Sequence, residues 1–165
     1  MKITRVFIHG LESTSQGTKG VFFRKRYPDM IIEDFWGSIS QRMEKLEHLL
    51  SGKSHLILVG SSFGGLMAAM YACLHEKRLQ KLILLAPALH LEPYDQYRDK
   101  KLHMPVIIFH GLQDDVVPIE SVRTIAQHQF TDCIFHAVED DHSLHSTFVK
   151  LEWNSLFELQ DPPAD

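Results

Sequence analysis

The chain has 165 residues, enough for one domain with a sizeable hydrophobic core. Apolar residues make up 44% of it and charged residues 23%, proportions that are typical of a globular protein in water. The formal charge of −4 gives no electrostatic reason to expect a nucleic acid or an anionic membrane as a partner.

Cysteine usage and the first residues both bear on where the protein works. Cys73 and Cys133 lie far apart in apolar surroundings, with the spacing of neither a metal site nor a disulfide framework, which favours a reducing compartment. The start, MKITRVFIHG, lacks the long apolar run and the cleavage site of a signal peptide. No apolar run approaches the roughly 20 residues that cross a bilayer. We therefore expect a cytoplasmic protein.

Short apolar runs alternate with amphipathic segments along the chain. The apolar runs predict six strands, at residues 3–10, 30–35, 54–60, 81–88, 104–111 and 132–138. Helical spacing and stop signals predict helices at residues 18–26, 38–50, 63–75, 119–129 and 144–159. In the second helix, Ser38 and Gln41 fit a capping box.

This alternation defines the expected fold class. Nearly all-apolar strands separated by helices indicate an α/β fold, with a mostly parallel sheet of six strands and helices on both faces. We expect a single domain over residues 1–160, followed by a frayed tail at 161–165. Ligands of such sheets bind beyond the carboxyl ends of the strands, so the loops that follow the strands are the candidate site.

The third predicted strand ends in GSSFG, residues 60–64, which fits the pattern G-x-S-x-G with Ser62 at its centre. Glycines allow a sharp turn from strand to helix, which exposes the serine hydroxyl beside the free N–H groups of the helix N-terminus. The alternative is a glycine-rich turn in which Ser62 only caps the helix.

Two later loops carry the groups that a serine nucleophile needs, because its hydroxyl is weak without a base. The fifth strand ends in HGLQDDVVP, with Asp114 and Asp115, and the sixth is followed by DDHSL, with His142. The resulting order of serine, acid and histidine is that of one large hydrolase fold.

The sequence contains eleven histidines, so the choice of base needs an argument. His110 lies at a strand end, His136 within a strand and His145 in the last predicted helix, whereas His142 lies in the loop after the sixth strand. We expect His9 to be structural. His142 and His145 have H-x-x-H spacing, but no other residue suggests a metal.

Four motifs in this order, the dipeptide HG at 9–10, GSSFG, HGLQDDVVP and DDHSL, resemble a small α/β-hydrolase. The resemblance is to compact bacterial serine esterases with little or no cap domain, and it runs from His9 to about Leu159. It implies Ser62 as nucleophile and His142 as general base. The family pattern G-x-x-D-x-x-V-P favours Asp114 as the acid, with Asp115 as the alternative.

The resemblance also implies the rest of the site. The backbone N–H groups of Leu11 and Phe63 would form the oxyanion hole, and no cofactor or metal is expected. Segment 87–103 is too short for more than a small lid. The candidate substrate-binding residues are Leu11, Glu12, Leu89, Tyr94 and Val117.

The function implied is hydrolysis of carboxylic esters of small to medium acyl groups through an acyl-enzyme. The sequence leaves open an acyl thioesterase with the same triad, an amidase or peptidase, and a non-catalytic binding protein on the same fold. A nucleotide-binding flavodoxin-like domain is disfavoured, because the P-loop lysine and the pattern G-x-G-x-x-G are missing. The expected partner is a small acyl ester or thioester.

Overall fold

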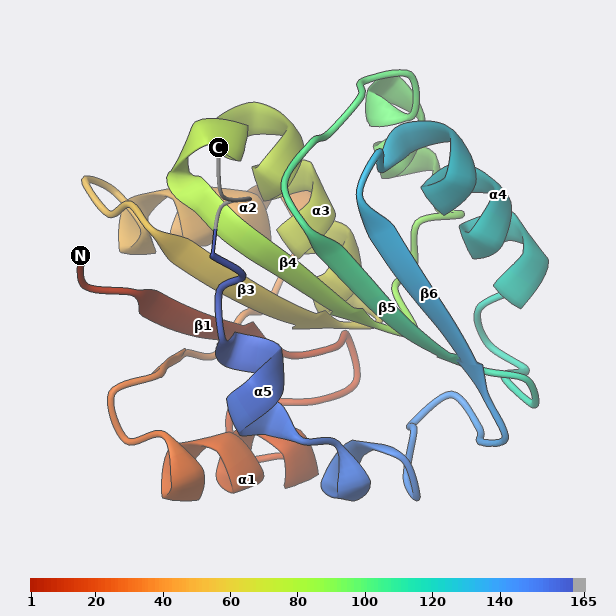
Figure 1. Ribbon diagram of the computed structural model, residues 1–165, viewed down its shortest axis with the longest axis horizontal. Coiled ribbons are helices and arrows are strands. Elements are labelled where there is room, and N and C mark those ends of the chain that lie inside the picture. Colours follow the sequence, from red (N-terminus) through yellow and green to blue (C-terminus); the bar gives the residue numbers. More distant parts are fainter. Residues whose placement is uncertain (162–165) are drawn as a thin grey trace.

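A computed structural model describes residues 1–161 of the chain, and over these residues the strands form one six-stranded parallel sheet (Figure 1). The strand order is β2-β1-β3-β4-β5-β6. The strands are β1 (Thr4–Ile8), β2 (Ile31–Ile32), β3 (Leu56–Ser61), β4 (Leu79–Leu85), β5 (Val106–Gly111) and β6 (Cys133–Val138). The predicted fold class is confirmed.

The order of the strands reverses direction between β1 and β3. The chain passes from β1 to β2 on one side and then returns to place β3 on the other side of β1. Ile8, the last residue of β1, pairs with Gly60 of β3. The loops that leave β1 and β3 therefore begin side by side, at the kind of crevice where open α/β sheets bind ligands.

Helices cover both faces of the sheet (Figure 1). On one face lie α2 (Ile39–Leu49), α3 (Phe63–His75) and α4 (Ile119–Gln129), and on the other lie α1 (Thr18–Arg26) and α5 (Trp153–Phe157). Successive side chains of β3 point to opposite faces of the sheet. Leu58 packs against the face that α3 covers, and Val59 packs against the face that α1 and α5 cover. Three short 3₁₀ helices occur among residues 1–161: η1 (Glu76–Arg78), η2 (Glu92–Tyr97) and η3 (Phe148–Lys150).

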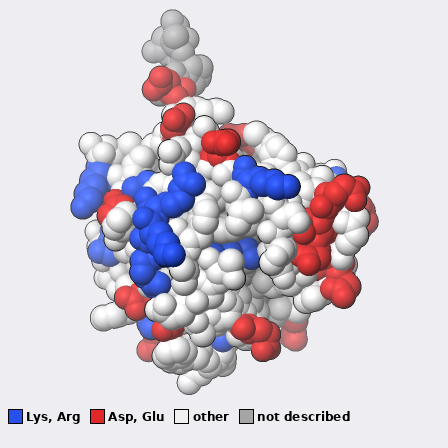
Figure 2. Space-filling model, turned by 90° about the horizontal axis from the view of Figure 1, so that it is seen from below, with Lys and Arg blue, Asp and Glu red and all other residues white. Residues whose placement is uncertain are grey.

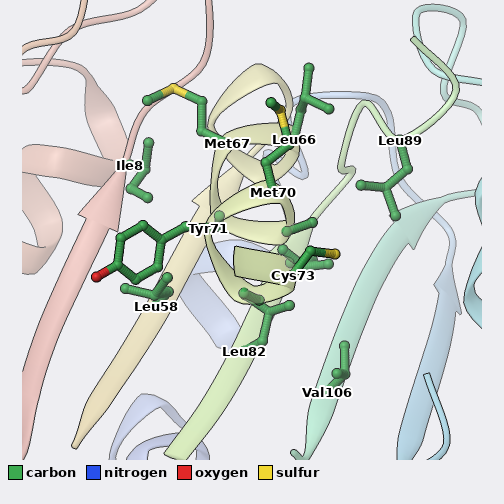
Figure 3. Close-up of a cluster of buried hydrophobic side chains, with 14 of the residues drawn as sticks. Ile8, Leu58, Leu66, Met67, Met70, Tyr71, Cys73, Leu82, Leu89 and Val106 are labelled. Carbon is green, nitrogen blue, oxygen red and sulfur yellow. The ribbon is translucent and has the colours of Figure 1, made fainter. Parts of the chain in front are cut away.

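Helix α3, which begins directly after Ser62, is buried along most of its length. Its side chains pack among residues of four strands and of the β4–β5 connection; Figure 3 labels Leu66, Met67, Met70, Tyr71 and Cys73 of α3 with Ile8, Leu58, Leu82, Val106 and Leu89. Neighbours on every side explain why its sequence is apolar all round rather than amphipathic.

The opposite face is covered by an aromatic cluster. Phe23 of α1 contacts both Trp153 and Phe148, with ring centroids 4.7 and 5.3 Å away. Aromatic pairs at these separations add stabilisation beyond the area they bury.

Seen from this face, Lys and Arg gather in one band and Asp and Glu lie mainly elsewhere (Figure 2). No helix in the described part of the chain is long and apolar enough to cross a membrane.

Two predicted elements are corrected. The predicted helix at 144–159 is instead η3 and the short α5, because Leu144 has a positive φ of 53° and the Asp140 carboxylate accepts the N–H groups of Ser146 and Thr147. The predicted strand at 30–35 shrinks to two residues, because Phe35 donates its N–H to His9 rather than to a strand. Residues 162–165 of the predicted tail lie outside the described residues.

Candidate active site

Ser62 lies at the sharp turn between β3 and α3. Its backbone has φ 55° and ψ −113°, a conformation that costs a residue with a side chain about 1–3 kcal/mol. A Cβ on Gly60 would collide with the carbonyl of Gly64, and one on Gly64 would collide with the carbonyls at the end of β1. Both glycines of the motif are therefore required by close backbone packing.

Hydrogen bonds to the end of β4 hold the turn in place. The N–H of Ser62 donates to the Leu85 carbonyl at 2.9 Å, and the Ser62 carbonyl accepts from Ala88 at 3.0 Å. The same carbonyl accepts from Gly65 at 3.0 Å, in the first turn of α3. The strained residue is thus fixed from both neighbouring elements, and its hydroxyl has a defined direction.

The structure brings the three predicted groups into one hydrogen-bonded line. His142 Nδ1 lies 2.8 Å from Asp114 Oδ2, and His142 Nε2 lies 2.9 Å from Ser62 Oγ. Because an ionised carboxylate only accepts, Nδ1 carries the proton. Nε2 is then the bare nitrogen, and it accepts the hydrogen bond from the Ser62 hydroxyl.

The Asp114 side chain is fully buried, and every contact to it favours the ionised form. Its Oδ1 accepts the N–H groups of Val116 and Val117 at 2.9 and 2.8 Å. Burial raises the pKa of Asp114, but these bonds and His142 outweigh it, so its pKa is lowered overall. Asp115 is exposed. The structure therefore places Asp114, and not Asp115, against His142.

The loop that carries His142 is organised by Asp140, which sequence reasoning missed. Its carboxylate accepts N–H groups from Asp141, Ser146 and Thr147 at 2.7–3.0 Å. Gly111 of β5 packs so closely beneath the loop that a Cβ there would collide with the Asp140 carbonyl. An Asp in the loop directly after a strand was the available signal, because Asp side chains often accept hydrogen bonds from nearby backbone N–H groups.

The other histidines take different positions. His136 is exposed on β6 and stacks on Phe109 with ring centroids 4.7 Å apart. His145 is exposed in the loop after β6, and His110 is fully buried beside Asp114. Among these, only His142 reaches Ser62.

The predicted oxyanion donors lie on either side of the serine. Phe63 is the first residue of α3, and Leu11 follows the Gly10 turn. A Cβ built on Gly10 would lie 3.5 Å from Ser62 Cβ, so that turn is directly beside Ser62. Within residues 1–161 no hydrogen bond uses the N–H of Leu11 or of Phe63. Both N–H groups are thus free to receive a negative oxygen.

His9 has the structural position that was predicted for it. The ring is 1% exposed, its Nδ1 lies 2.7 Å from the Gly10 carbonyl, and its Nε2 accepts the N–H of Phe35 at 2.9 Å. An Nε2 that accepts leaves the proton on Nδ1. Burial lowers the pKa of His9, which keeps the ring neutral. His9 thereby joins the Leu11 loop to the loop after β2.

The predicted substrate-binding residues divide into two groups. Leu11, 50% exposed, and Glu12, also exposed, lie on the open side of the site. Leu89, Tyr94 and Val117 are instead buried in the core, each at most 1% exposed, which corrects their assignment as contacts for a substrate in an open site.

Segment 87–103 is anchored to the core through its 3₁₀ helix η2. The Tyr94 hydroxyl of η2 donates to Gln129 of α4 at 2.6 Å, and the Gln129 amide donates to the Tyr97 carbonyl at 2.9 Å. A cavity of about 430 Å³ lies between this segment and α4. It is lined by His90, Arg98, Glu120, Ser121, Thr124 and Ile125.

No group of three or more His, Cys, Asp or Glu side chains within the described residues is placed to hold a metal ion. Cys73 is buried and Cys133 is partly buried, and both are free thiols. Burial raises the pKa of each thiol, so neither has the character of a reactive thiolate.

Comparison with known proteins agrees with this architecture. A family model described as the alpha/beta hydrolase fold matches residues 25–102. The chain has the α/β-hydrolase fold. No curated protein matches the sequence.

Several solved structures share this α/β-hydrolase fold. A putative YdeN-like hydrolase from Pectobacterium atrosepticum has a TM-score of 0.74 and 21% identity, and the match covers 93% of this chain and 86% of that one. A monoacylglycerol lipase from Paleococcus ferrophilus has a TM-score of 0.73 and 14% identity, over 93% and 90% of the two chains. An esterase from a marine microorganism has a TM-score of 0.72 and 13% identity, over 95% of each. Identities this low establish the fold alone.

Proposed function

We propose that the chain is a serine hydrolase that cleaves carboxylic esters of small to medium acyl groups. The observation that carries the proposal is the continuous line from Ser62 Oγ through His142 to Asp114, with contacts of 2.9 and 2.8 Å. A serine that lies within hydrogen-bond reach of a base, with the base oriented by a third group, is the arrangement that activates a weak nucleophile.

In the proposed reaction, His142 Nε2 takes the proton of Ser62 as Oγ attacks the carbonyl carbon of the ester. The imidazolium that forms is stabilised by the Asp114 carboxylate through Nδ1. The negative oxygen of the tetrahedral intermediate receives hydrogen bonds from the N–H groups of Leu11 and Phe63. His142 then protonates the leaving alcohol, and a water molecule repeats the sequence on the acyl-enzyme to release the acid.

Exposed apolar side chains in the loops after the strands support an acyl substrate. Leu11 follows β1, and Leu112 and Val116 follow β5, with exposed fractions between 46% and 59%. All three lie at the carboxyl edge of the sheet, where Ser62 also lies. Apolar surface of this kind binds an acyl chain by removing it from water, about 0.8 kcal/mol per buried CH₂ group. An open rim without a large cap suits small to medium acyl groups.

The test is hydrolysis of p-nitrophenyl esters from acetate to octanoate by wild type, Ser62→Ala and Ser61→Ala. We expect turnover by wild type and Ser61→Ala and its loss in Ser62→Ala, with a chain-length profile that reports the acyl surface. Turnover that survives in Ser62→Ala would refute the nucleophile assignment. Acyl thioesters are assayed in parallel, because a thioesterase would use the same triad and differ only in the preferred leaving group.

A covalent probe separates an unreactive site from a wrong substrate. An organophosphonate ester that reacts with activated serines should add to Ser62 of wild type and to no residue of Ser62→Ala, as read by mass spectrometry of peptides. Absence of both labelling and turnover would favour a non-catalytic binding protein on this fold.

A further inference from the structure

His110 is the fully buried histidine of β5, and the proposed reaction does not use it. The side chains of His110 and Asp114 are both 0% exposed. His110 Nε2 lies 3.0 Å from the Val117 carbonyl oxygen and 3.2 Å from Asp114 Oδ2. Burying a polar ring beside a buried carboxylate is unfavourable unless the contacts compensate for the lost hydration, so its contacts need an explanation.

The surroundings of His110 determine which nitrogen carries its proton. Nε2 faces two oxygen atoms, which would repel a lone pair at that position, so the proton is on Nε2 and is donated to the Val117 carbonyl. Nδ1 is buried and has no hydrogen-bond partner within the described residues. A second proton at Nδ1 would therefore be an unsatisfied buried donor.

The charge state follows from the same contacts. Burial lowers the pKa of His110, and although the Val117 carbonyl and Asp114 act in the opposite direction, His142 and Arg123 also disfavour a positive charge. The ring is therefore a neutral Nε2–H imidazole. The short contact between His110 and Asp114 is not an ion pair, and the charge of Asp114 remains available to His142.

A short path of hydrogen bonds leads from His110 to the carboxylate. His110 Nε2 donates to the carbonyl of Val117, and the N–H of Val117 donates to Asp114 Oδ1 at 2.8 Å. The positive end of the same Nε2–H bond lies beside Oδ2, the oxygen that accepts the hydrogen bond from His142 Nδ1. His110 thus acts on both oxygens of Asp114, on one through Val117 and on the other directly.

We propose that His110 is a positioning residue for the acid of the triad. As a neutral Nε2–H donor it fixes the turn at Val117 and with it the orientation of the Asp114 carboxylate toward His142. The proposal rests on the proposed function, since it assigns His110 a role in that same triad. His110 does not reach the substrate, so its effect is on the chemical step and not on binding.

Two substitutions separate the donor from the ring. His110→Phe keeps an aromatic ring without a donor, and His110→Gln places an amide N–H near the position of Nε2. His136→Phe is the matched control, because His136 is exposed and a phenyl ring there can still stack on Phe109. Wild type and the three variants are compared by the kcat and KM of ester hydrolysis and by thermal unfolding.

We expect His110→Phe to lower kcat about tenfold, the effect of losing one hydrogen bond in the transition state, with KM unchanged. Without this donor the orientation of the Asp114 carboxylate toward the imidazolium of the transition state is no longer fixed, so the loss should appear in kcat and not in KM. His110→Gln should recover most of kcat. Equal loss of kcat in both variants, or a rise in KM in place of the fall in kcat, would overturn the proposal.

A measurement on wild type covers the case in which His110→Phe does not fold and needs no substrate. In ¹⁵N-labelled protein, the His110 signals should report a proton on Nε2, a bare Nδ1 and a neutral ring throughout the pH range in which the protein is folded. A proton on Nδ1, or a cationic ring at neutral pH, would overturn the proposal. Failure of the proposed function would appear separately, as turnover that does not depend on Ser62.

Discussion

Replacing Asp114 by Asn tests the site most directly, because the structure determines which way the new amide must face. The oxygen of Asn is needed at the Oδ1 position, where it accepts the N–H groups of Val116 and Val117. The amide NH₂ then points at His142 Nδ1 and can only donate to it. His142 would have to carry its proton on Nε2, which faces Ser62 and could no longer accept the serine proton.

The size of the effect follows from this change in the tautomer of His142. The reverse orientation of the amide would place NH₂ against the N–H of Val117 and leave that donor unsatisfied, at a cost of about 1–3 kcal/mol. The protein therefore keeps the wrong tautomer of His142. Loss of the correct tautomer in a serine triad lowers kcat about 10⁴-fold, which corresponds to about 5 kcal/mol of transition-state stabilisation.

The assay is ester hydrolysis under saturating substrate, with Asp115→Asn as the matched control. Asp115 is the neighbouring carboxylate, and it is exposed, so its variant should keep kcat within a factor of two or so of wild type, as surface substitutions usually do. If Asp114→Asn lost less than about tenfold, or if Asp115→Asn were equally impaired, the tautomer argument and the assignment of the acid would both be wrong.

Three further predictions concern folding and stability. Gly64→Ala should give little or no folded protein on size-exclusion chromatography, because its Cβ would collide with β1 carbonyls, whereas Gly10→Ala meets only ordinary contacts at 3.5 Å. Tyr94→Phe leaves Gln129 Oε1 without its buried donor and should lower the urea-unfolding free energy by about 1–3 kcal/mol while kcat is unchanged. Burial raises the pKa of Asp140, but the hydrogen bonds to its carboxylate outweigh burial and lower the pKa overall. The stability that the ionised carboxylate contributes is therefore fully present above the unfolded-state pKa of about 3.9, and it is lost as pH falls through the lower pKa of the folded state. Asp140→Asn should therefore lower Tm at neutral pH and weaken its dependence on acid pH.

Most of the fold follows from local signals in the sequence. Helices 18–26, 63–75 and 119–129 have the predicted bounds, and the capping box of Ser38 and Gln41 has both of its hydrogen bonds. Start and stop residues such as Pro28 and Pro118 mark where helices 18–26 and 119–129 end and begin. The prediction of one helix at 144–159 was wrong. Apolar residues of this segment pack in an aromatic cluster on α1, a long-range contact that helical periodicity does not encode.

The contacts among Ser62, Asp114 and His142 could also be predicted, because each of the three residues follows a strand of a parallel sheet and these strands end at one edge. The burial of Leu89, Tyr94 and Val117 could not, since it depends on how segment 87–103 packs against α4. A position in a loop near the site says nothing about whether the side chain points out or in. The hydrogen bond from the Tyr94 hydroxyl to Gln129 holds the side chain of Tyr94 in the core.

The dipeptide HG occurs twice, at the ends of β1 and β5, and in both copies the histidine hydrogen-bonds the loop that follows the strand. His9 and His110 are buried, and burial lowers the pKa of each ring. Each ring donates its N–H to a backbone carbonyl of its own loop. The first loop carries the N–H of Leu11, and the second carries Asp114. His142, by contrast, is partly exposed and its nitrogens face two side chains. What separates His142 from the two buried histidines is therefore the partners of its ring nitrogens, which no spacing in the sequence reveals.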